Sequence, residues 1–234
     1  MSRSAIAIVS GGMDSVTLAH DLASQGYQLT LLSFDYGQRH RDRELAFARA
    51  CAERLGATHH VVDMSWLATL MPGSALTDTS VDVPEGHYAE DNMRLTVVPG
   101  RNADMLAPAF SIASASGAQL VAAAMHAGDH AVYPDCRPKF MEAFQAMEDA
   151  GLEGFHTPQL HTPYITMTKG EICRRGSELE VPYAQTWSCY KGEQIHCGRC
   201  GTCVERIEAF TEAGVPDPTE YADRDYAAQV LAAR

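Results

Sequence analysis

The chain has 234 residues, of which 46% are hydrophobic and 21% charged, and this balance predicts a soluble globular protein. Thirty acidic residues outnumber 18 basic ones, and the net charge of −12 argues against the basic face that a large nucleic-acid footprint needs. No apolar run approaches the roughly 20 residues of a membrane span, and the apolar stretch at the N-terminus is too short for a signal peptide. We therefore expect a cytoplasmic protein with no nucleic-acid or membrane partner.

Short apolar runs alternate with helical patterns in the first part of the chain. The expected elements are strands at 6–9, 29–34 and 59–62 and helices at 15–24 and 42–55. A βαβαβ order of this kind predicts an α/β fold with a doubly wound parallel sheet, which binds ligands at the carboxyl ends of its strands.

The second part of the chain begins with residues 71–99, whose weak periodicity predicts a lid, a binding loop or a disordered segment. Further expected elements are helices at 103–116, 138–148, 168–179, 204–213 and 225–232 and a strand at 119–125. Thr168 and Glu171 have the spacing of a helix capping box. We divide the chain into a main domain at 1–186 and a small cysteine-containing helical segment at 187–234.

The sequence Ser10-Gly11-Gly12 joins the first expected strand to the first expected helix. Glycines allow a tight turn and a close approach of a ligand to the backbone, and the N-terminus of a helix attracts anions. The turn is therefore a candidate phosphate site, although for the glycine pair by itself an ordinary strand-to-helix connection is the favoured interpretation.

Four of the seven cysteines, Cys189, Cys197, Cys200 and Cys203, follow the spacing C-x7-C-x2-C-x2-C. Tight C-x2-C turns supply thiolates to a tetrahedral zinc ion, and four such ligands leave no open position, so we expect a structural zinc site. Three alternatives remain open: an iron–sulfur cluster, a site in which His196 replaces one sulfur, and thiols without metal.

Polar residues at the expected ends of strands and helices are candidate substrate contacts. Asn102 is also a plausible N-cap, Cys136 is expected to be a buried thiol, and Lys169 lies where a helix dipole disfavours a cation unless an anionic ligand binds it. The candidate substrate contacts are Asp35, Tyr36, Gln38, Arg39, Arg101, Asn102, Asp135 and Arg137.

SGGMDS, from Ser10 to Ser15, lacks the lysine of a P-loop and resembles the SGGxDS motif of the PP-loop ATP pyrophosphatases. Seven further motifs follow it in one order along nearly the whole chain. They are SFDYGQRH, VPGRN, HAGD, YPDCRP, TKGEI, TWSCYKG and CGRCGTCVER. This series resembles the QueC family of the queuosine pathway.

The resemblance implies an ATP-dependent ligase that converts 7-carboxy-7-deazaguanine and ammonia to the 7-cyano compound through adenylated carboxylate and amide intermediates. It also implies Mg²⁺ with the ATP, one zinc ion bound by the four cysteines, and a homodimer. Catalytic roles are implied for Asp14 and Ser15, to which we add Lys169 from its charge and position. The implied ATP-binding segment comprises Val9, Ser10, Gly11, Gly12, Met13, Asp14, Ser15, Val16, Thr17, Leu18 and Ala19.

Two rival functions remain open at this point. One is an adenylating ligase of the same type whose acceptor is a tRNA or a protein amine. The other is a zinc-binding module without catalysis, although such a module is expected to carry more basic and aromatic residues around its cysteines.

Overall fold

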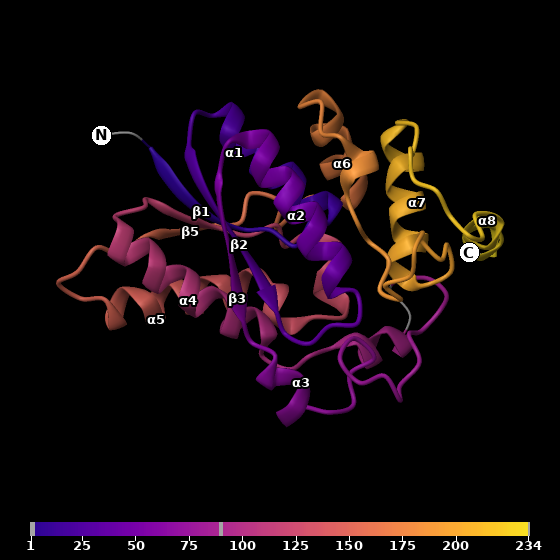
Figure 1. The fold of residues 1–234 in the computed structure, drawn as a ribbon, viewed down its shortest axis with the longest axis horizontal. Helices are drawn as coiled ribbons and strands as arrows, with labels where there is room; N and C mark the ends of the chain where they lie inside the picture. The colour runs from indigo at the N-terminus through magenta and orange to yellow at the C-terminus, as the bar shows by residue number, and fades with distance from the viewer. Residues whose placement is uncertain (1–2, 89–90, 234) are drawn as a thin grey trace.

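The computed structural model describes residues 3–88 and 91–233. Within these residues, five parallel strands form one sheet in the order β3-β2-β1-β4-β5 (Figure 1). The strands are β1 (Ser4–Ile8), β2 (Gln28–Asp35), β3 (Thr58–Asp63), β4 (Leu120–Ala122) and β5 (Gln159–His161). The chain builds β1, β2 and β3 in one direction and then returns to place β4 on the other side of β1. This order confirms the predicted doubly wound sheet.

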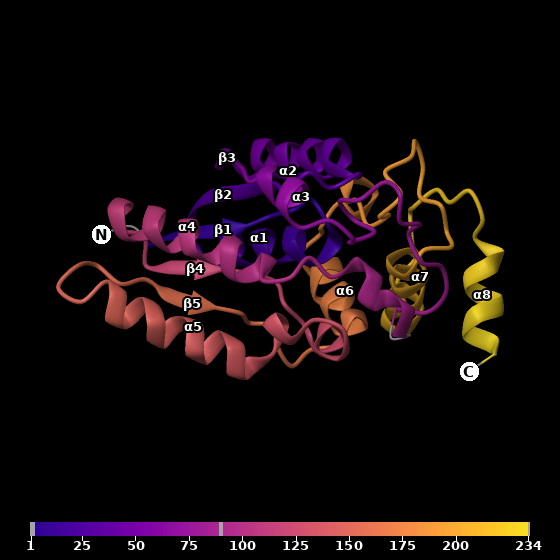
Figure 2. The same ribbon diagram turned by 90° about the horizontal axis from the view of Figure 1, so that it is seen from below.

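Helices cover both faces of the sheet (Figures 1 and 2). The α-helices are α1 (Met13–Ser24), α2 (Arg41–Leu55), α3 (Trp66–Leu70), α4 (Arg101–Ser116), α5 (Pro138–Gly151), α6 (Lys169–Glu178), α7 (Gly201–Ala213) and α8 (Asp225–Ala232). Short 3₁₀ turns are η1 (Asp91–Thr96), η2 (Ala127–Ala131), η3 (Pro134–Cys136) and η4 (Tyr183–Gln185).

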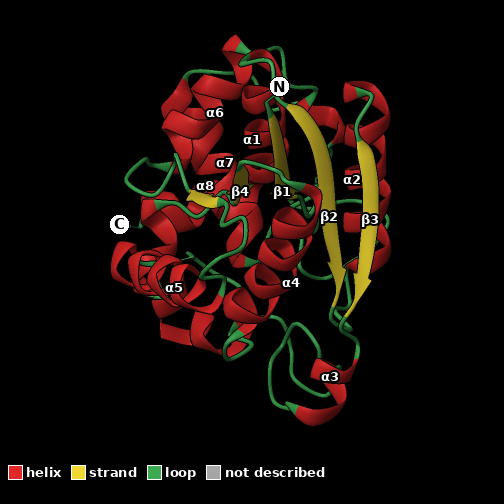
Figure 3. Ribbon diagram, turned by 90° about the vertical axis from the view of Figure 1, so that its left-hand side faces the viewer, coloured by secondary structure: helices red, strands yellow, loops and turns green. Residues whose placement is uncertain are grey.

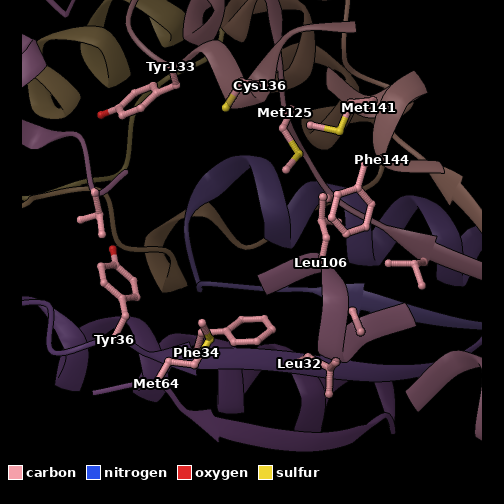
Figure 4. Packing of buried hydrophobic residues seen from close by; sticks show 14 of the residues in the cluster. Leu32, Phe34, Tyr36, Met64, Leu106, Met125, Tyr133, Cys136, Met141 and Phe144 are labelled. Carbon is pink, nitrogen blue, oxygen red and sulfur yellow. The ribbon is translucent and has the colours of Figure 1, made fainter. Parts of the chain in front are cut away.

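The central strand β1 is buried on both faces, as a parallel sheet covered by helices requires. Ala5 and Ala7 point into a hydrophobic cluster shared with α1, α2, α6 and α7, whereas Ile6 points into a cluster shared with α4 and α5. Small side chains on the first face leave room for the close approach of α1. Figure 4 shows part of the second cluster, where Leu106 of α4 and Phe144 of α5 lie near each other.

Local signals for helix ends are confirmed at two helices. Thr168 accepts the backbone N–H of Glu171, and the Glu171 carboxylate accepts the N–H of Thr168, which forms the expected capping box of α6. Gly56 ends α2 in the left-handed conformation, with φ of 61°. These helix ends depend on residues adjacent in sequence, which is why the sequence predicts them well.

The N-terminus of α4 differs from the prediction. Asn102 is not the N-cap but lies inside the first turn, because Gly100 occupies the capping position with φ of 74°. The side chain that receives the free backbone N–H of Asn102 belongs to Asp135, at an N–O distance of 3.2 Å. A side chain from a distant loop thus replaces the local cap.

The sequence misplaces the weakest elements. The strand expected at 119–125 is confirmed only over β4, and the three-residue strand β5 carries no apolar run that would reveal it. Part of the segment expected to be irregular, 71–99, forms η1, and its described residues include Leu76 and Met93 in the hydrophobic core. Figure 3 shows α3 and the loop beyond it at one end of the molecule.

The last helices pack against the sheet domain through α6 and α7, with α8 farther out (Figure 1). An ion pair between Arg175 and Asp21, 2.7 Å apart, fastens α6 to α1. The rings of Tyr183 and Phe210 meet edge to face, with centroids 5.0 Å apart. In the part of the chain that the structure describes, no helix combines the length and the apolar character needed to cross a bilayer.

Candidate active site and metal centre

A cleft of about 240 Å³ opens at the carboxyl ends of β1 and β4, where the winding of the sheet reverses. The loops after β1, β2 and β4 form its floor and sides. Trp187, Ser188 and Tyr190 close it from the C-terminal segment, together with Thr202 of α7. Residues on both sides of the expected boundary at 186/187 therefore share one cleft, while the boundary itself stays a prediction.

The loop between β1 and α1 packs tightly against α2. Gly11 has φ of 82°, and a Cβ there would lie only 2.5 Å from the Glu44 carbonyl oxygen and 2.9 Å from the Ala48 nitrogen. Trp187 donates its backbone N–H to the Gly11 carbonyl at 2.9 Å. Glycine is required here because α2 passes directly behind the loop.

The first turn of α1 faces the cleft. Its leading backbone N–H groups lack carbonyl acceptors within the helix, so they attract an anion. The Ser15 hydroxyl lies 3.2 Å from the Gly12 carbonyl oxygen and 3.3 Å from the Ser10 hydroxyl, which holds the turn closed. The arrangement has the backbone geometry of a phosphate-binding loop.

Only part of the expected ATP-binding segment lines the cleft. The lining residues of that segment are Val9, Ser10, Gly12, Met13, Asp14 and Ser15. Gly11 lies on the side of the loop that packs against α2 and does not line the cleft. The remaining members are buried along α1, namely Val16, Thr17, Leu18 and Ala19. These four consecutive residues lie farther along α1 and contact other elements of the core; the Thr17 hydroxyl, for example, lies 3.3 Å from the Tyr183 hydroxyl.

Three charged groups meet at the floor of the cleft. The Lys169 ammonium lies 3.1 Å from Asp14 Oδ2 and 2.6 Å from Glu205 Oε2. Burial by itself lowers the pKa of Lys169, but the carboxylates of Asp14 and Glu205 outweigh it and hold that pKa above its ordinary value. Lys169 therefore stays positively charged, at the first residue of α6.

A second polar group borders this floor. His126 Nδ1 accepts the Gly128 N–H at 3.1 Å, so the ring proton lies on Nε2. Nε2 faces the carboxylates of Asp129 and Asp14, at 3.5 and 3.9 Å. The histidine thus adds a hydrogen-bond donor to an otherwise carboxylate-rich floor.

The floor fits a divalent cation that accompanies phosphates. Asp14 Oδ1 is buried and has no hydrogen-bond partner among the described residues. An unpaired carboxylate oxygen beside a phosphate-binding turn is the kind of ligand that Mg²⁺ takes. Asp14 therefore has one oxygen available for a metal while its other oxygen contacts Lys169.

A cationic, aromatic compartment adjoins this floor, because the Tyr88 ring lies 5.8 Å from the Lys169 ammonium and 6.3 Å from the Tyr133 ring. Arg101 donates to the Tyr36 hydroxyl at 3.1 Å, and its guanidinium lies 5.2 Å from the Tyr36 ring centroid and 5.9 Å from that of Tyr133. Tyr88 and Tyr190 also line the cleft. No carboxylate pairs with Arg101 within residues 3–88 and 91–233. An aromatic wall with an uncompensated guanidinium suits a planar anionic ligand.

Figure 4 shows Tyr36 and Tyr133 at one end of the cluster of buried side chains, with the thiol of Cys136 beside Met125. Burial raises the pKa of the Cys136 thiol, and nearby carboxylates add to this effect. The thiol accepts a hydrogen bond from the Asn102 amide at 3.3 Å. Cys136 is therefore a buried, protonated thiol.

Of the eight candidate substrate contacts, Tyr36, Arg101 and Asn102 line the cleft. Asp135 receives the Asn102 N–H, as described above. Gln38 is buried and braces the loop after β2, because its amide contacts the Tyr36 N–H, the Phe34 carbonyl and Glu44.

The other three candidates have partners outside the cleft. Asp35 accepts the Gly37 N–H and pairs with Arg41. Arg39 donates to the carbonyls of Asp78 and Val81, and Arg137 donates to the carbonyl of His130. These side chains are engaged in holding loops.

The four clustered cysteines form a buried group whose sulfur atoms all lie within 4.8 Å of one another. Cys197 and Cys203 sulfurs are 3.9 Å apart, and those of Cys189 and Cys200 are 4.0 Å apart. Zn–S bonds of about 2.3 Å set sulfur–sulfur separations of about 3.8 Å in a tetrahedron. The group therefore fits one tetrahedral metal ion, whereas a cluster of several irons would spread its ligands farther.

His196 is not a member of this group. Its Nε2 accepts the Ser188 N–H at 3.1 Å, and its ring lies against Trp187 with centroids 4.2 Å apart.

The turn between Cys197 and Cys200 contains Gly198. Gly198 has φ of 78°, and a Cβ there would overlap the carbonyl oxygen of Asp223. The turn between Cys197 and Cys200 thus needs glycine for both its conformation and its packing.

Several cleft residues were given no role by the sequence. Asp129 and Tyr190 belong to the motifs HAGD and TWSCYKG, and Glu205 follows the last cysteine of CGRCGTCVER. Those motifs mark the segments but not the role of each side chain. Tyr88 comes from the segment of weak periodicity, where no local signal identifies it.

The family model of the queuosine biosynthesis protein QueC matches residues 4–214. Three similar proteins, all named 7-cyano-7-deazaguanine synthase, cover nearly the whole chain. That of Paracoccus denitrificans (strain Pd 1222) is 56% identical over 98% of this chain and 97% of its own length. That of Ruegeria sp. (strain TM1040) is 58% identical, with coverage of 98% and 97%, and that of Rhizobium meliloti (strain 1021) is 58% identical, with coverage of 94% and 93%.

Among solved structures, the crystal structure of a 4-thiouridine synthetase–RNA complex with bound ATP is similar in fold. Its TM-score is 0.51 at 13% identity, over 99% of this chain and 54% of that chain. At this level of identity the likeness concerns the fold alone.

Proposed function

The chain belongs to the QueC family, and we propose that it uses ATP to convert 7-carboxy-7-deazaguanine and ammonia into 7-cyano-7-deazaguanine. The observation that carries this proposal is identity of 56–58% along nearly the whole length of proteins named 7-cyano-7-deazaguanine synthase. The cleft supports it, because a phosphate-binding turn and a cationic aromatic compartment open into the same space.

The proposed chemistry activates oxygen as a leaving group. A carboxylate oxygen of the substrate attacks the α-phosphate of ATP and releases pyrophosphate. Ammonia then displaces AMP to give the amide. The amide oxygen attacks the α-phosphate of a second ATP and releases pyrophosphate and an N–H proton, and loss of AMP together with the remaining N–H proton then leaves the nitrile. The protein contributes positioning and neutralisation of charge at the phosphates.

We assign the phosphate side of this reaction to the loop after β1. The backbone N–H groups at the start of α1 and the hydroxyls of Ser10 and Ser15 would contact the phosphates. Asp14 would hold Mg²⁺ through its unpaired oxygen, and Lys169 would supply positive charge from the floor. Mg²⁺ would draw electron density from the phosphate oxygens when bound.

We assign the deazaguanine side to the compartment around Arg101. The flat base would stack against the tyrosine rings, and the guanidinium would attract its carboxylate. Ammonia would enter from solution. Asn102, which lines the same cleft, would contact the base.

We further infer that the ion bound by the four cysteines is zinc in a structural role, since all four ligand positions are occupied by protein. The enzyme would act as a cytoplasmic homodimer on small molecules. The net charge of −12 disfavours a tRNA acceptor.

The first experiment is mass spectrometry of the products formed from ATP, ammonium and 7-carboxy-7-deazaguanine. We expect the nitrile together with AMP and pyrophosphate, and no nitrile when ammonium is omitted. Formation of AMP without nitrile, in the presence of all three substrates, would show that the protein adenylates an acceptor other than 7-carboxy-7-deazaguanine. Neither product, from folded and metal-loaded protein, would overturn the proposal.

A further inference from the structure

We propose that Glu205 is a positioning residue, which holds the Lys169 ammonium at the phosphate-binding loop and so leaves Asp14 available to Mg²⁺. The inference rests on the proposed use of Mg²⁺-ATP. Glu205 itself does not belong to the lining of the cleft and acts through Lys169.

The geometry places Lys169 between two carboxylates on different elements. Its ammonium is 2.6 Å from Glu205 Oε2 of α7 and 3.1 Å from Asp14 Oδ2 of α1. Glu205 is only 7% exposed, and a buried carboxylate is costly without a paired cation. The Lys169 ammonium is the cation that pairs with it.

Lys169 needs such a partner because its own helix opposes it. It is the first residue of α6, where the helix dipole repels a positive charge. The anionic groups that face its ammonium are Asp14, Glu205 and, at longer range, Asp129. Of these, Glu205 makes the shortest contact and accepts a hydrogen bond from the ammonium.

Asp14 has two competing partners in the proposed reaction. Its Oδ2 contacts Lys169, whereas its buried Oδ1 has no partner among the described residues. A Mg²⁺ ion draws on the same carboxylate charge that attracts the lysine. Glu205 weakens the competition between Lys169 and Mg²⁺ for Asp14, because the ammonium stays paired with Glu205 when Asp14 coordinates the metal ion.

The position of Glu205 is set by the metal centre. Its helix, α7, has Cys200 as N-cap and carries Cys203 in its first turn, two residues before Glu205. The helix also packs closely on α6, since a Cβ on Gly170 would lie 2.5 Å from a carboxylate oxygen of Glu212. The four cysteines thus fix the helix that presents Glu205 to Lys169.

The test uses Glu205→Gln in the full-length, metal-loaded protein, with Glu208→Gln as the matched control. Glu208 lies on the same helix and pairs with His87, away from Lys169. Binding of α,β-methylene-ATP, which cannot be cleaved between these phosphates, is measured by calorimetry over a range of Mg²⁺ concentrations. We expect the Mg²⁺ concentration for half-maximal binding to rise roughly tenfold in Glu205→Gln and to stay unchanged in Glu208→Gln.

A double-mutant cycle separates positioning from a structural role. In a Lys169→Met background, Glu205→Gln is expected to leave the Mg²⁺ requirement unaltered, because the group through which Glu205 acts is gone. If the two substitutions change the Mg²⁺ requirement additively, the inference is wrong. The amount of bound metal and the melting temperature are measured for each variant. If Glu205→Gln does not fold, Glu205→Asp replaces it, because its shorter side chain places the carboxylate farther from Lys169.

The outcomes distinguish this inference from the proposed function. Wild-type protein that binds the analogue with Mg²⁺ but forms no nitrile from the natural substrates would contradict the proposed function alone. An unchanged Mg²⁺ requirement in folded Glu205→Gln would contradict the role of Glu205, whatever product the wild-type protein forms. A rise confined to the Lys169-containing background supports it.

Discussion

Asp14 is the residue to which we assign Mg²⁺ at the proposed phosphate site. It follows the glycine turn directly, in the first turn of α1, and it is the carboxylate whose buried oxygen has no partner among the described residues. Its position could be predicted from sequence, because the turn and the helix start are both local features. Its pairing with Lys169, 155 residues later in the sequence (169 minus 14), depends on the fold.

We expect Asp14→Asn to lower kcat/KM for ATP by about a hundredfold, since the amide cannot supply the charge that Mg²⁺ requires. Steady-state release of pyrophosphate measures this. The control is Asp42→Asn, whose side chain is 86% exposed and pairs with Arg41 at the surface. Turnover of Asp14→Asn at the wild-type rate, with metal content unchanged, would show that Asp14 does not hold Mg²⁺.

At the scale of elements, α7 joins the metal centre to the cleft. Its N-terminal turn contains Cys200 and Cys203, and Thr202 between them donates its hydroxyl to the Ser188 carbonyl at the edge of the cleft. Arg206, one turn farther on, is fully buried and donates to the carbonyl of Tyr183. A single helix therefore carries two cysteines of the candidate metal centre, cleft lining and core contacts.

We expect Cys200→Ser to bind less than one zinc ion per chain and to lower the melting temperature by roughly 10 °C, because metal-binding free energy would contribute directly to folding. Atomic emission gives zinc per chain, and circular dichroism gives the melting temperature. Cys51→Ala is the control, since Cys51 is a buried thiol of α2 outside the cysteine group. Full zinc content in folded Cys200→Ser would contradict the assigned ligand set.

At the scale of the whole molecule, the last 48 residues, 187–234, contribute to the core of the rest. Ala209 and Phe210 of α7 belong to the same hydrophobic cluster as Leu18 and Leu22 of α1. Trp187 also donates its backbone N–H to the Gly11 carbonyl in the loop after β1. These contacts argue that the two expected units fold together, although each has its own sequence character.

We expect a chain truncated after Thr186 to lose cooperative unfolding. The truncation removes α7 and so exposes the apolar side chains of the core that pack against Phe210. Thermal melts by circular dichroism test this. A chain that ends at Arg224 lacks only α8, of which Ala227 alone is buried among the described residues, and it should melt cooperatively. A cooperative transition in the 1–186 chain would support 1–186 as an independent domain.

Features that depend on neighbouring residues could be predicted from the amino-acid sequence alone. Alternating strands and helices, the glycine turn before Asp14, the capping box of α6 and the cysteine spacing are all local patterns, which act over a few residues along the chain. The tertiary structure decided which distant side chains share the cleft. Tyr88, Arg101 and Lys169 come from three separate segments, and only the packing of α4, α6 and the segment that contains Tyr88 brings them into one cleft.

The same reason explains the candidate residues that lie outside the cleft. Arg39 and Arg137 have the charge of substrate contacts, but buried loop carbonyls need donors, and these guanidinium groups supply them. Residue type and spacing reveal what a side chain is able to bind. Which of the available partners it meets depends on the fold, because hydrogen-bonding demands of distant segments compete for the same side chains.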